Sequence, residues 1–96
     1  MLELDYVVRR LMIHGRVQGV AFRANAQFEA ERLGLHGWVR NRSDGRVEAL
    51  VAGKPEAVDA FVNWAHRGPS HARVDAVEIG TAERPERLEF LTLPTL

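Results

Sequence analysis

A loop with two glycines, Gly15 and Gly19, joins a strand-like segment to a helix-like segment near the start of the chain. Apolar residues alternate over 6–14, which predicts a strand, and their wider spacing over 22–33 predicts an amphipathic helix. Glycines let backbone N–H groups turn toward one anion, and the start of a helix adds unpaired donors and the positive end of its dipole. Arg23, in the first helical turn, adds a permanent charge that can bind two oxygens. The segment is therefore a candidate phosphate site.

This loop does not fit two familiar nucleotide-binding patterns. No Lys-Ser or Lys-Thr follows Gly19, as a Walker loop requires, and the glycine spacing is not that of the dinucleotide fingerprint. A loop of this kind often serves only to turn a strand into a helix, and a helical arginine is usually a solvated charge. The position of Arg23 favours a ligand, because the helix dipole disfavours a cation at this end unless an anion joins it.

The remaining patterns predict one α+β domain spanning residues 1–96. The Asp44-Gly45 pair marks a hairpin turn, Pro55 suits the first position of a helix, and Gly68-Pro69 suits its end. The order β-α-β-β-α-β with an extra final strand predicts a ferredoxin-like sandwich, with two helices on one face of a mainly antiparallel four- to five-stranded sheet. The predicted strands span 6–14, 35–42, 46–52, 74–79 and 88–93, and the predicted helices span 22–33 and 55–67.

Composition excludes several classes of protein. Thirteen Lys and Arg balance thirteen Asp and Glu, so the basic surplus of a typical nucleic-acid binder is missing. The absence of cysteine excludes disulfides, thiolate nucleophiles and Cys-ligated zinc, and the four histidines lack metal-ligand spacing, so no metal site is expected. Residues 1–5 do not resemble a secretory signal, and no apolar run could span a bilayer. We expect a cytoplasmic monomer with no membrane partner.

A second candidate residue, Asn41, lies at the end of the strand predicted over 35–42. Strand alternation places it on the face of Val39, which the helices are expected to cover, and places Trp38 on the opposite face. Asparagine favours turns, so Asn41 could simply cap the hairpin, although Asp44-Gly45 already supplies the turn residues. A nearby set of arginines is expected to form a solvated face that also attracts anions: Arg40, Arg42 and Arg46.

Two segments, Gly15–Arg23 and Gly37–Asn41, together resemble the two signatures of the acylphosphatases, and the resemblance extends along essentially the whole chain. It implies an enzyme that hydrolyses the carboxyl–phosphate bond of small acyl phosphates without a metal, a cofactor or a phosphoenzyme. It also implies that Arg23 binds the phosphate and that Asn41 holds the attacking water. The backbone expected to cradle the phosphoryl oxygens is that of Arg16, Val17, Gln18, Gly19 and Val20.

Two segments depart from the family pattern. Residues 24–27 are smaller or more polar than in many relatives, which predicts looser helix packing and an unaffected site. The end of the chain contains Pro94 and no terminal base, which predicts a short last strand and leaves open whether this end reaches Arg23.

The alternative function is a non-catalytic phosphate- or RNA-binding module with the same fold. An RNA-recognition sheet carries aromatic residues on its two central strands. The strand predicted over 46–52 has none, and the strand over 6–14 has only Tyr6. We therefore expect a small-molecule substrate and no nucleic-acid partner.

Overall fold

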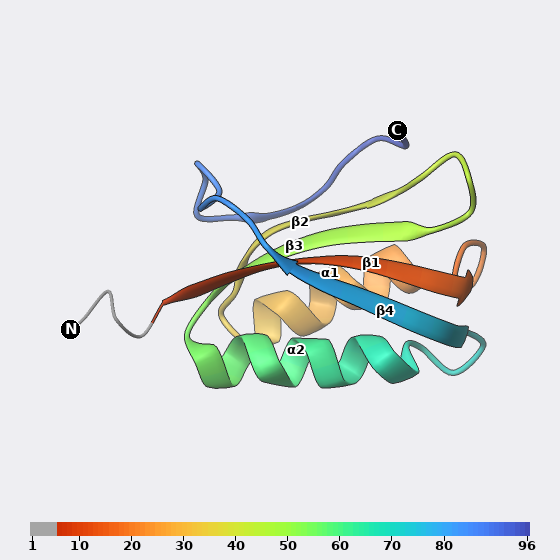
Figure 1. Ribbon diagram of the computed structural model, residues 1–96, viewed down its shortest axis with the longest axis horizontal. Helices are drawn as coiled ribbons and strands as arrows, with labels where there is room; N and C mark the ends of the chain where they lie inside the picture. The colour runs from red at the N-terminus through yellow and green to blue at the C-terminus, as the bar shows by residue number, and fades with distance from the viewer. Residues whose placement is uncertain (1–5) are drawn as a thin grey trace.

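The computed structural model of the protein describes residues 6–96; residues 1–5, in which no secretory signal is predicted, lie outside the described part. The elements of this part follow the predicted order (Figure 1). Their bounds are β1 (Val7–Arg16), α1 (Phe22–Arg32), β2 (His36–Asn41), β3 (Val47–Gly53), α2 (Pro55–Arg67), β4 (Arg73–Thr81) and β5 (Phe90–Thr92). The last strand is shorter than the predicted 88–93, as Pro94 suggested.

The sheet has the strand order β4-β1-β3-β2-β5. The pairs β1–β3, β1–β4 and β2–β3 are antiparallel, and β5 runs parallel to β2. Both helices lie on the same side of this sheet (Figure 1). The predicted ferredoxin-like α+β sandwich is therefore confirmed. One consequence matters for the site: β1 and β2 are not neighbours, because β3 lies between them.

The core fills the space between the sheet and the helices, as the predicted periodicities require. Gly34, with a φ of 72°, follows the last turn of α1, and Gly68 caps α2, so both helices end where glycine permits a left-handed or extended exit. The buried side chains of the helices are Phe22, Ala26 and Ala30 on α1 and Val58, Phe61 and Ala65 on α2. They pack against sheet residues that include Leu11, Ile13, Val39, Val47, Ala49 and Val51.

Glu48 on β3 is buried, although it lies on the sheet face that the helices do not cover. Alternation predicts that it faces away from the helices and into solvent, yet the residue is only 5% exposed. Two arginines cover it: Arg10 Nε lies 2.6 Å from Oε2, and Arg42 Nη1 lies 3.0 Å from Oε1. The Glu48 carboxylate can be buried here because charged hydrogen bonds from the two arginines to both of its oxygens replace hydrogen bonds from water. Arg42 is therefore half-buried in an ion pair and is not part of a fully solvated face.

His36, at the start of β2, is partly buried and packs against the ring of Tyr6. Its Nε2 and the Tyr6 hydroxyl form a 2.5 Å hydrogen bond, and the Arg84 guanidinium lies over the Tyr6 ring, 4.2 Å from its centre. Burial, and secondly the charge of Arg84, lower the pKa of His36 below its ordinary value of 6.5. Burial raises the pKa of the Tyr6 hydroxyl, so the pair is neutral near pH 7.

This environment predicts acid sensitivity of the fold. The unfolded chain accepts a proton on His36 at a higher pH than the folded protein does, so the free energy of unfolding falls as the pH drops below about 6.5. We expect His36→Gln to lose less stability than the wild type between pH 7 and pH 5. Urea unfolding of both proteins at these two pH values measures the difference. Identical losses would show that His36 does not contribute to the pH dependence.

Candidate active site

The loop between β1 and α1 has an unusual backbone that glycine makes possible. A bulge interrupts the β1–β4 register after His14, and Gly15 has a φ of 131°. A Cβ on Gly15 would lie 2.1 Å from the carbonyl oxygen of Arg73, so no other residue fits there. Gly19 has a φ of 76°. Gly15 and Gly19 therefore give this loop a backbone conformation that other residues rarely adopt.

The start of α1 is left without a side-chain cap. Ala21, the residue before the helix, has a left-handed conformation (φ 62°, ψ 29°), and it is the only non-glycine residue with positive φ in the described chain. It caps no backbone N–H with a side chain, and the first turn carries no acidic residue. The positive end of the helix dipole is therefore not offset locally by a carboxylate.

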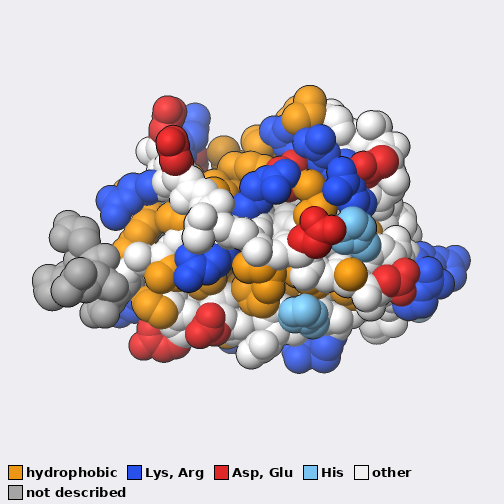
Figure 2. All heavy atoms as spheres, in the orientation of Figure 1, with side chains coloured by type: hydrophobic (Ala, Val, Ile, Leu, Met, Phe, Trp, Pro, Cys, Tyr) orange, Lys and Arg blue, Asp and Glu red, His pale blue; other side chains and the backbone are white. Residues whose placement is uncertain are grey.

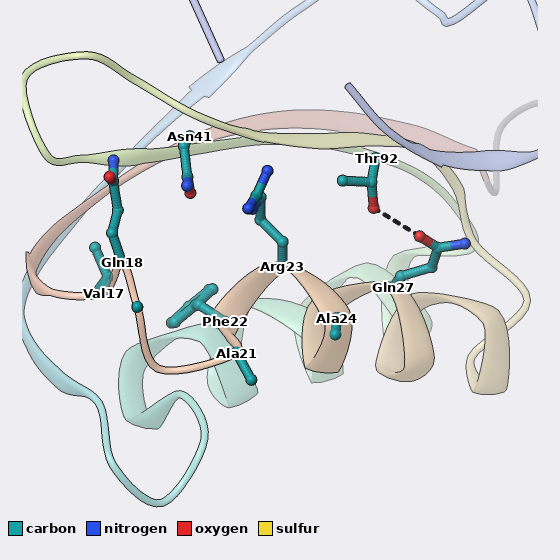
Figure 3. A pocket seen from close by; sticks show the side chains of 10 residues that line it. Val17, Gln18, Ala21, Phe22, Arg23, Ala24, Gln27, Asn41 and Thr92 are labelled. Atoms are coloured by element: carbon teal, nitrogen blue, oxygen red, sulfur yellow. Dashed lines mark hydrogen bonds between the residues drawn. The ribbon is translucent and has the colours of Figure 1, made fainter. Parts of the chain in front are cut away.

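Arg23 and Asn41 lie on opposite walls of one cavity of about 400 Å³. Arg23 projects from α1 toward the sheet, and Asn41 projects from the end of β2 into the same space (Figure 3). Both side chains are half-buried. The cavity is lined by Val17, Gln18, Gly19, Ala21, Phe22, Arg23, Ala24, Gln27, Asn41 and Thr92.

Only part of the predicted phosphate cradle, residues 16–20, lines this cavity. Val17, Gln18 and Gly19 border the cavity, whereas Arg16 and Val20 do not. Arg16 is the exposed last residue of β1, and Val20 packs against the hydrophobic core. The middle of the loop and the start of α1 thus form the wall that faces Asn41.

Five lining residues were not predicted as site residues: Ala21 and Phe22, which belong to the first motif, and Ala24, Gln27 and Thr92, which lie outside both motifs. Ala24 and Gln27 lie in the segment that was expected to leave the site unaffected, yet both line this cavity. Gln27 is one helical turn after Arg23, a spacing that could have placed it on the same face. Thr92 on β5 donates a 2.7 Å hydrogen bond to Gln27 Oε1 (Figure 3).

The last residues of the chain also approach the site. The Leu96 backbone N–H donates to the carbonyl oxygen of Asn41 at 3.1 Å, and the Leu96 carbonyl oxygen accepts from the Ser43 N–H at 3.0 Å. The segment after β5 therefore runs alongside the backbone of Asn41 and of the hairpin residue Ser43. The sequence leaves open whether this end reaches Arg23; the contacts that the structure gives are with the backbone of Asn41 and Ser43.

The electrostatics of the cavity favour an anion. Within residues 6–96, no carboxylate lines the cavity and Arg23 forms no ion pair. The same residues hold no group of three His, Asp or Glu side chains that could bind a metal ion. A half-buried guanidinium that lacks a protein counter-charge is stabilised when a ligand supplies one.

Charged side chains gather around the hairpin between β2 and β3, near this cavity. Figure 2 shows blue basic groups clustered with red acidic groups on the upper right of the molecule. Arg46 pairs with Asp44 at 2.7 Å, and hydrogen bonds from Arg46 lower the pKa of Asp44. The pairing leaves both residues ionised across the neutral range and rigidifies the turn.

A ferredoxin-like sandwich with a glycine loop, a helix start and an arginine without an ion pair among residues 6–96 around one cavity defines a small α+β protein with a candidate anion site. Comparison with known proteins makes this more specific. The acylphosphatase family model matches residues 9–91. An acylphosphatase from Azoarcus sp. (strain BH72) is 58% identical over 87 residues, which are 91% of this chain and 89% of that protein.

Further relatives agree in sequence and in structure. An acylphosphatase from Thermococcus kodakarensis is 57% identical over 79 residues, which are 82% of this chain and 86% of that protein. The structure of an acylphosphatase from Coxiella burnetii superposes with a TM-score of 0.90 at 31% identity, covering 95% of this chain and 96% of that one. The chain belongs to the acylphosphatase family, and it is an enzyme of the hydrolase class. The resemblance drawn from the two sequence motifs is confirmed. No helix in the described residues is long and apolar enough to cross a membrane.

Proposed function

We propose that this cavity binds a small acyl phosphate and hydrolyses its carboxyl–phosphate bond by direct attack of water. The loop over 16–20 and Arg23 bind the phosphoryl group, and Asn41 orients the water. The observation that supports this assignment is the position of Arg23, which lacks a protein counter-charge and faces Asn41 across one cavity.

The proposed residue roles suit the chemistry of phosphoryl transfer. Negative charge is spread over the equatorial oxygens in the transition state, so catalysis depends on positioning and on electrostatic stabilisation. The Arg23 guanidinium can bind two of these oxygens, and the loop amides can bind others. The oxygen of water forms the new bond to phosphorus, the bond from phosphorus to the acyl oxygen breaks, and the carboxylate leaves with the electron pair. The two protons of the water stay on the phosphate product, which then equilibrates with solvent.

Asn41 suits the role of orienting the water. Its carboxamide offers one acceptor and two donor hydrogens, so it can fix a water molecule without taking its proton. A strong general acid is unnecessary, because a carboxylate is a stable leaving group. The cavity lining agrees with this requirement, since within the described residues it contains no Asp, Glu or His.

The acyl group of the substrate is assigned to the end of the cavity that lies away from the loop over 16–20. Beyond Arg23 the lining continues with Ala24, Gln27 and Thr92, and its volume of about 400 Å³ exceeds the needs of a phosphoryl group alone. The small side chain of Ala24 leaves room beside the guanidinium. The substrate class is therefore acyl phosphates with a compact acyl group.

A comparison of two substrates tests the reaction class. The protein is expected to hydrolyse benzoyl phosphate and to leave p-nitrophenyl phosphate, a simple phosphate monoester, essentially intact. Treatment with EDTA is expected to leave the rate unchanged, because no step of the scheme uses a metal. Hydrolysis of the monoester at a comparable rate, or loss of activity with EDTA, would contradict the proposal.

Substitution of Ala24 tests the acyl end separately. Ala24→Leu places a larger side chain beside Arg23 and is expected to raise the KM for benzoyl phosphate several-fold. The KM for acetyl phosphate is expected to change less, because its methyl group needs little room. The inhibition constant of inorganic phosphate is expected to stay within about two-fold, since phosphate lacks an acyl group. Equal effects on all three ligands would place the acyl group elsewhere.

We further propose that residues 1–96 act as one domain and as a monomer in the cytoplasm, with no nucleic-acid partner. The lack of cysteine suits a reducing compartment. Sedimentation equilibrium at micromolar concentration tests the monomer directly, and a dimer mass would overturn it.

A further inference from the structure

The side chain of Gln18 spans the space between the phosphate loop and the β2–β3 hairpin. Its Nε2 donates to the carbonyl oxygen of Arg42 at 2.7 Å and to that of Arg46 at 2.9 Å. Both hydrogens of the amide nitrogen are thus used, and in the described chain these are the only side-chain hydrogen bonds between the loop and the hairpin. Figure 3 shows Gln18 extended from the loop toward the sheet beside Asn41.

The sheet order explains why such a contact matters. The phosphate loop follows β1, and Asn41 ends β2, but β3 separates these two strands. No ladder of backbone hydrogen bonds therefore joins the element that binds phosphate to the strand that carries Asn41. Gln18 bridges this gap, because its two acceptors flank the hairpin: Arg42 directly follows Asn41, and Arg46 directly precedes β3.

We propose that Gln18 is a positioning residue, whose side chain sets the distance between the bound phosphoryl group and the water at Asn41. The inference rests on the proposed function. It assigns the Gln18 side chain a role separate from that of its backbone in the phosphate cradle. Gln18 acts through Arg42 and Arg46 and takes no part in bond making.

The two acceptors are held firmly enough to serve as anchors. The Arg42 N–H donates to the Arg46 carbonyl oxygen at 2.8 Å, and the Gly45 N–H donates to the Arg42 carbonyl oxygen at 3.1 Å. The Arg42 side chain is fixed by the buried carboxylate of Glu48, and the Arg46 side chain is fixed by Asp44. The hairpin therefore resists movement. The two hydrogen bonds from the Gln18 side-chain amide couple the position of the loop to the position of the hairpin.

The expected kinetic effect follows from the sensitivity of the reaction to distance. A misplacement of about 1 Å between reacting groups can cost about 100-fold in rate. Phosphate affinity depends on Arg23 and the loop amides, which remain when the Gln18 side chain is changed. Loss of the Gln18 amide is therefore expected to lower kcat far more than it weakens phosphate binding.

Gln18→Met tests the proposal, because methionine keeps the length of the side chain and removes both donors. We expect kcat for benzoyl phosphate to fall about 10- to 100-fold, while the inhibition constant of inorganic phosphate changes less than about three-fold. Ser43→Ala is the matched control, since it removes the hydroxyl of an exposed residue on the same hairpin and leaves the carbonyl acceptors and the ion pairs of Arg42 and Arg46 in place. Its kcat is expected to stay within about two-fold of wild type.

The outcomes separate the two proposals. A wild-type protein that does not hydrolyse benzoyl phosphate contradicts the proposed function. An active wild type with an unchanged kcat in Gln18→Met, or with equal losses of kcat and phosphate affinity, overturns the positioning role. If Gln18→Met does not fold, NMR of the wild type decides: hydrogen-bond couplings from Gln18 Nε2 to the Arg42 and Arg46 carbonyl carbons support the proposal, and rapidly exchanging side-chain amide protons overturn it.

Discussion

Arg23→Ala is expected to lower kcat/KM for benzoyl phosphate by about 1,000-fold or more and to abolish measurable binding of inorganic phosphate. The guanidinium is the cation of the cavity, and within the described residues no carboxylate lines the space around it. Its fork can hold two phosphoryl oxygens, and alanine leaves only the dipoles of the loop and the helix. Steady-state kinetics and calorimetric titration with phosphate measure the two losses.

The stability of this variant provides an internal check. A cation near the start of a helix is disfavoured by the dipole, and Arg23 has no ion-pair partner within residues 6–96. Its removal is therefore expected to leave the free energy of unfolding unchanged or to raise it by about 0.5 kcal/mol. Arg67→Ala, at the exposed end of α2, is the matched control and is expected to keep full activity. Retention of phosphate binding by Arg23→Ala would refute the assigned role.

Asn41→Ala is expected to lower kcat by about 100- to 1,000-fold while leaving phosphate affinity within about two-fold of wild type. The reason is the proposed division of roles across the cavity, in which Arg23 binds the phosphoryl group and Asn41 orients the water. Measuring kcat together with the inhibition constant of inorganic phosphate separates these roles. The free energy of unfolding is expected to change little, because the Asn41 side chain is half-buried at the end of a strand.

Asn63→Ala is the matched control for this experiment, since Asn63 is exposed on α2 and remote from the cavity lining. Its kinetic constants are expected to equal those of the wild type. The division of roles is incorrect if Asn41→Ala loses phosphate affinity as severely as Arg23→Ala does. A shared loss would mean that both side chains bind the phosphoryl group.

Local sequence patterns were sufficient to predict most of the fold and the half of the cavity that contains Arg23 and Asn41. The alternation around Val39 places Asn41 on the helix side, and the stripe Phe22, Ala26 and Ala30 packs as its spacing predicts. These predictions succeed because each depends on the period of a single element. The arrangement of Arg23 after the two-glycine loop is similarly encoded within one short segment.

The remaining features depend on contacts between segments that are distant in the chain. Thr92 enters the cavity only because β5 pairs in parallel with β2, placing Thr92 opposite Val39. Glu48 is buried only because Arg10 extends across it from β1 and Arg42 extends across it from the residue that follows β2. Strand alternation gives the face of a residue but not the length and direction of the side chains beside it. The position of Thr92 in the cavity and the burial of Glu48 therefore could not be predicted from the sequence.

The two ends of the cavity rest on parts of the sheet with different local stability. β3 is buried along its whole length between β1 and β2, so its amide hydrogens are expected to be among the last to exchange with solvent. β5 is a three-residue edge strand and is expected to open earlier. Transient fraying of β5 would release Thr92 while the loop, Arg23 and Asn41 stay in place. On the proposed function, opening of β5 would loosen the contacts to the acyl group and leave the residues assigned to the phosphoryl group undisturbed.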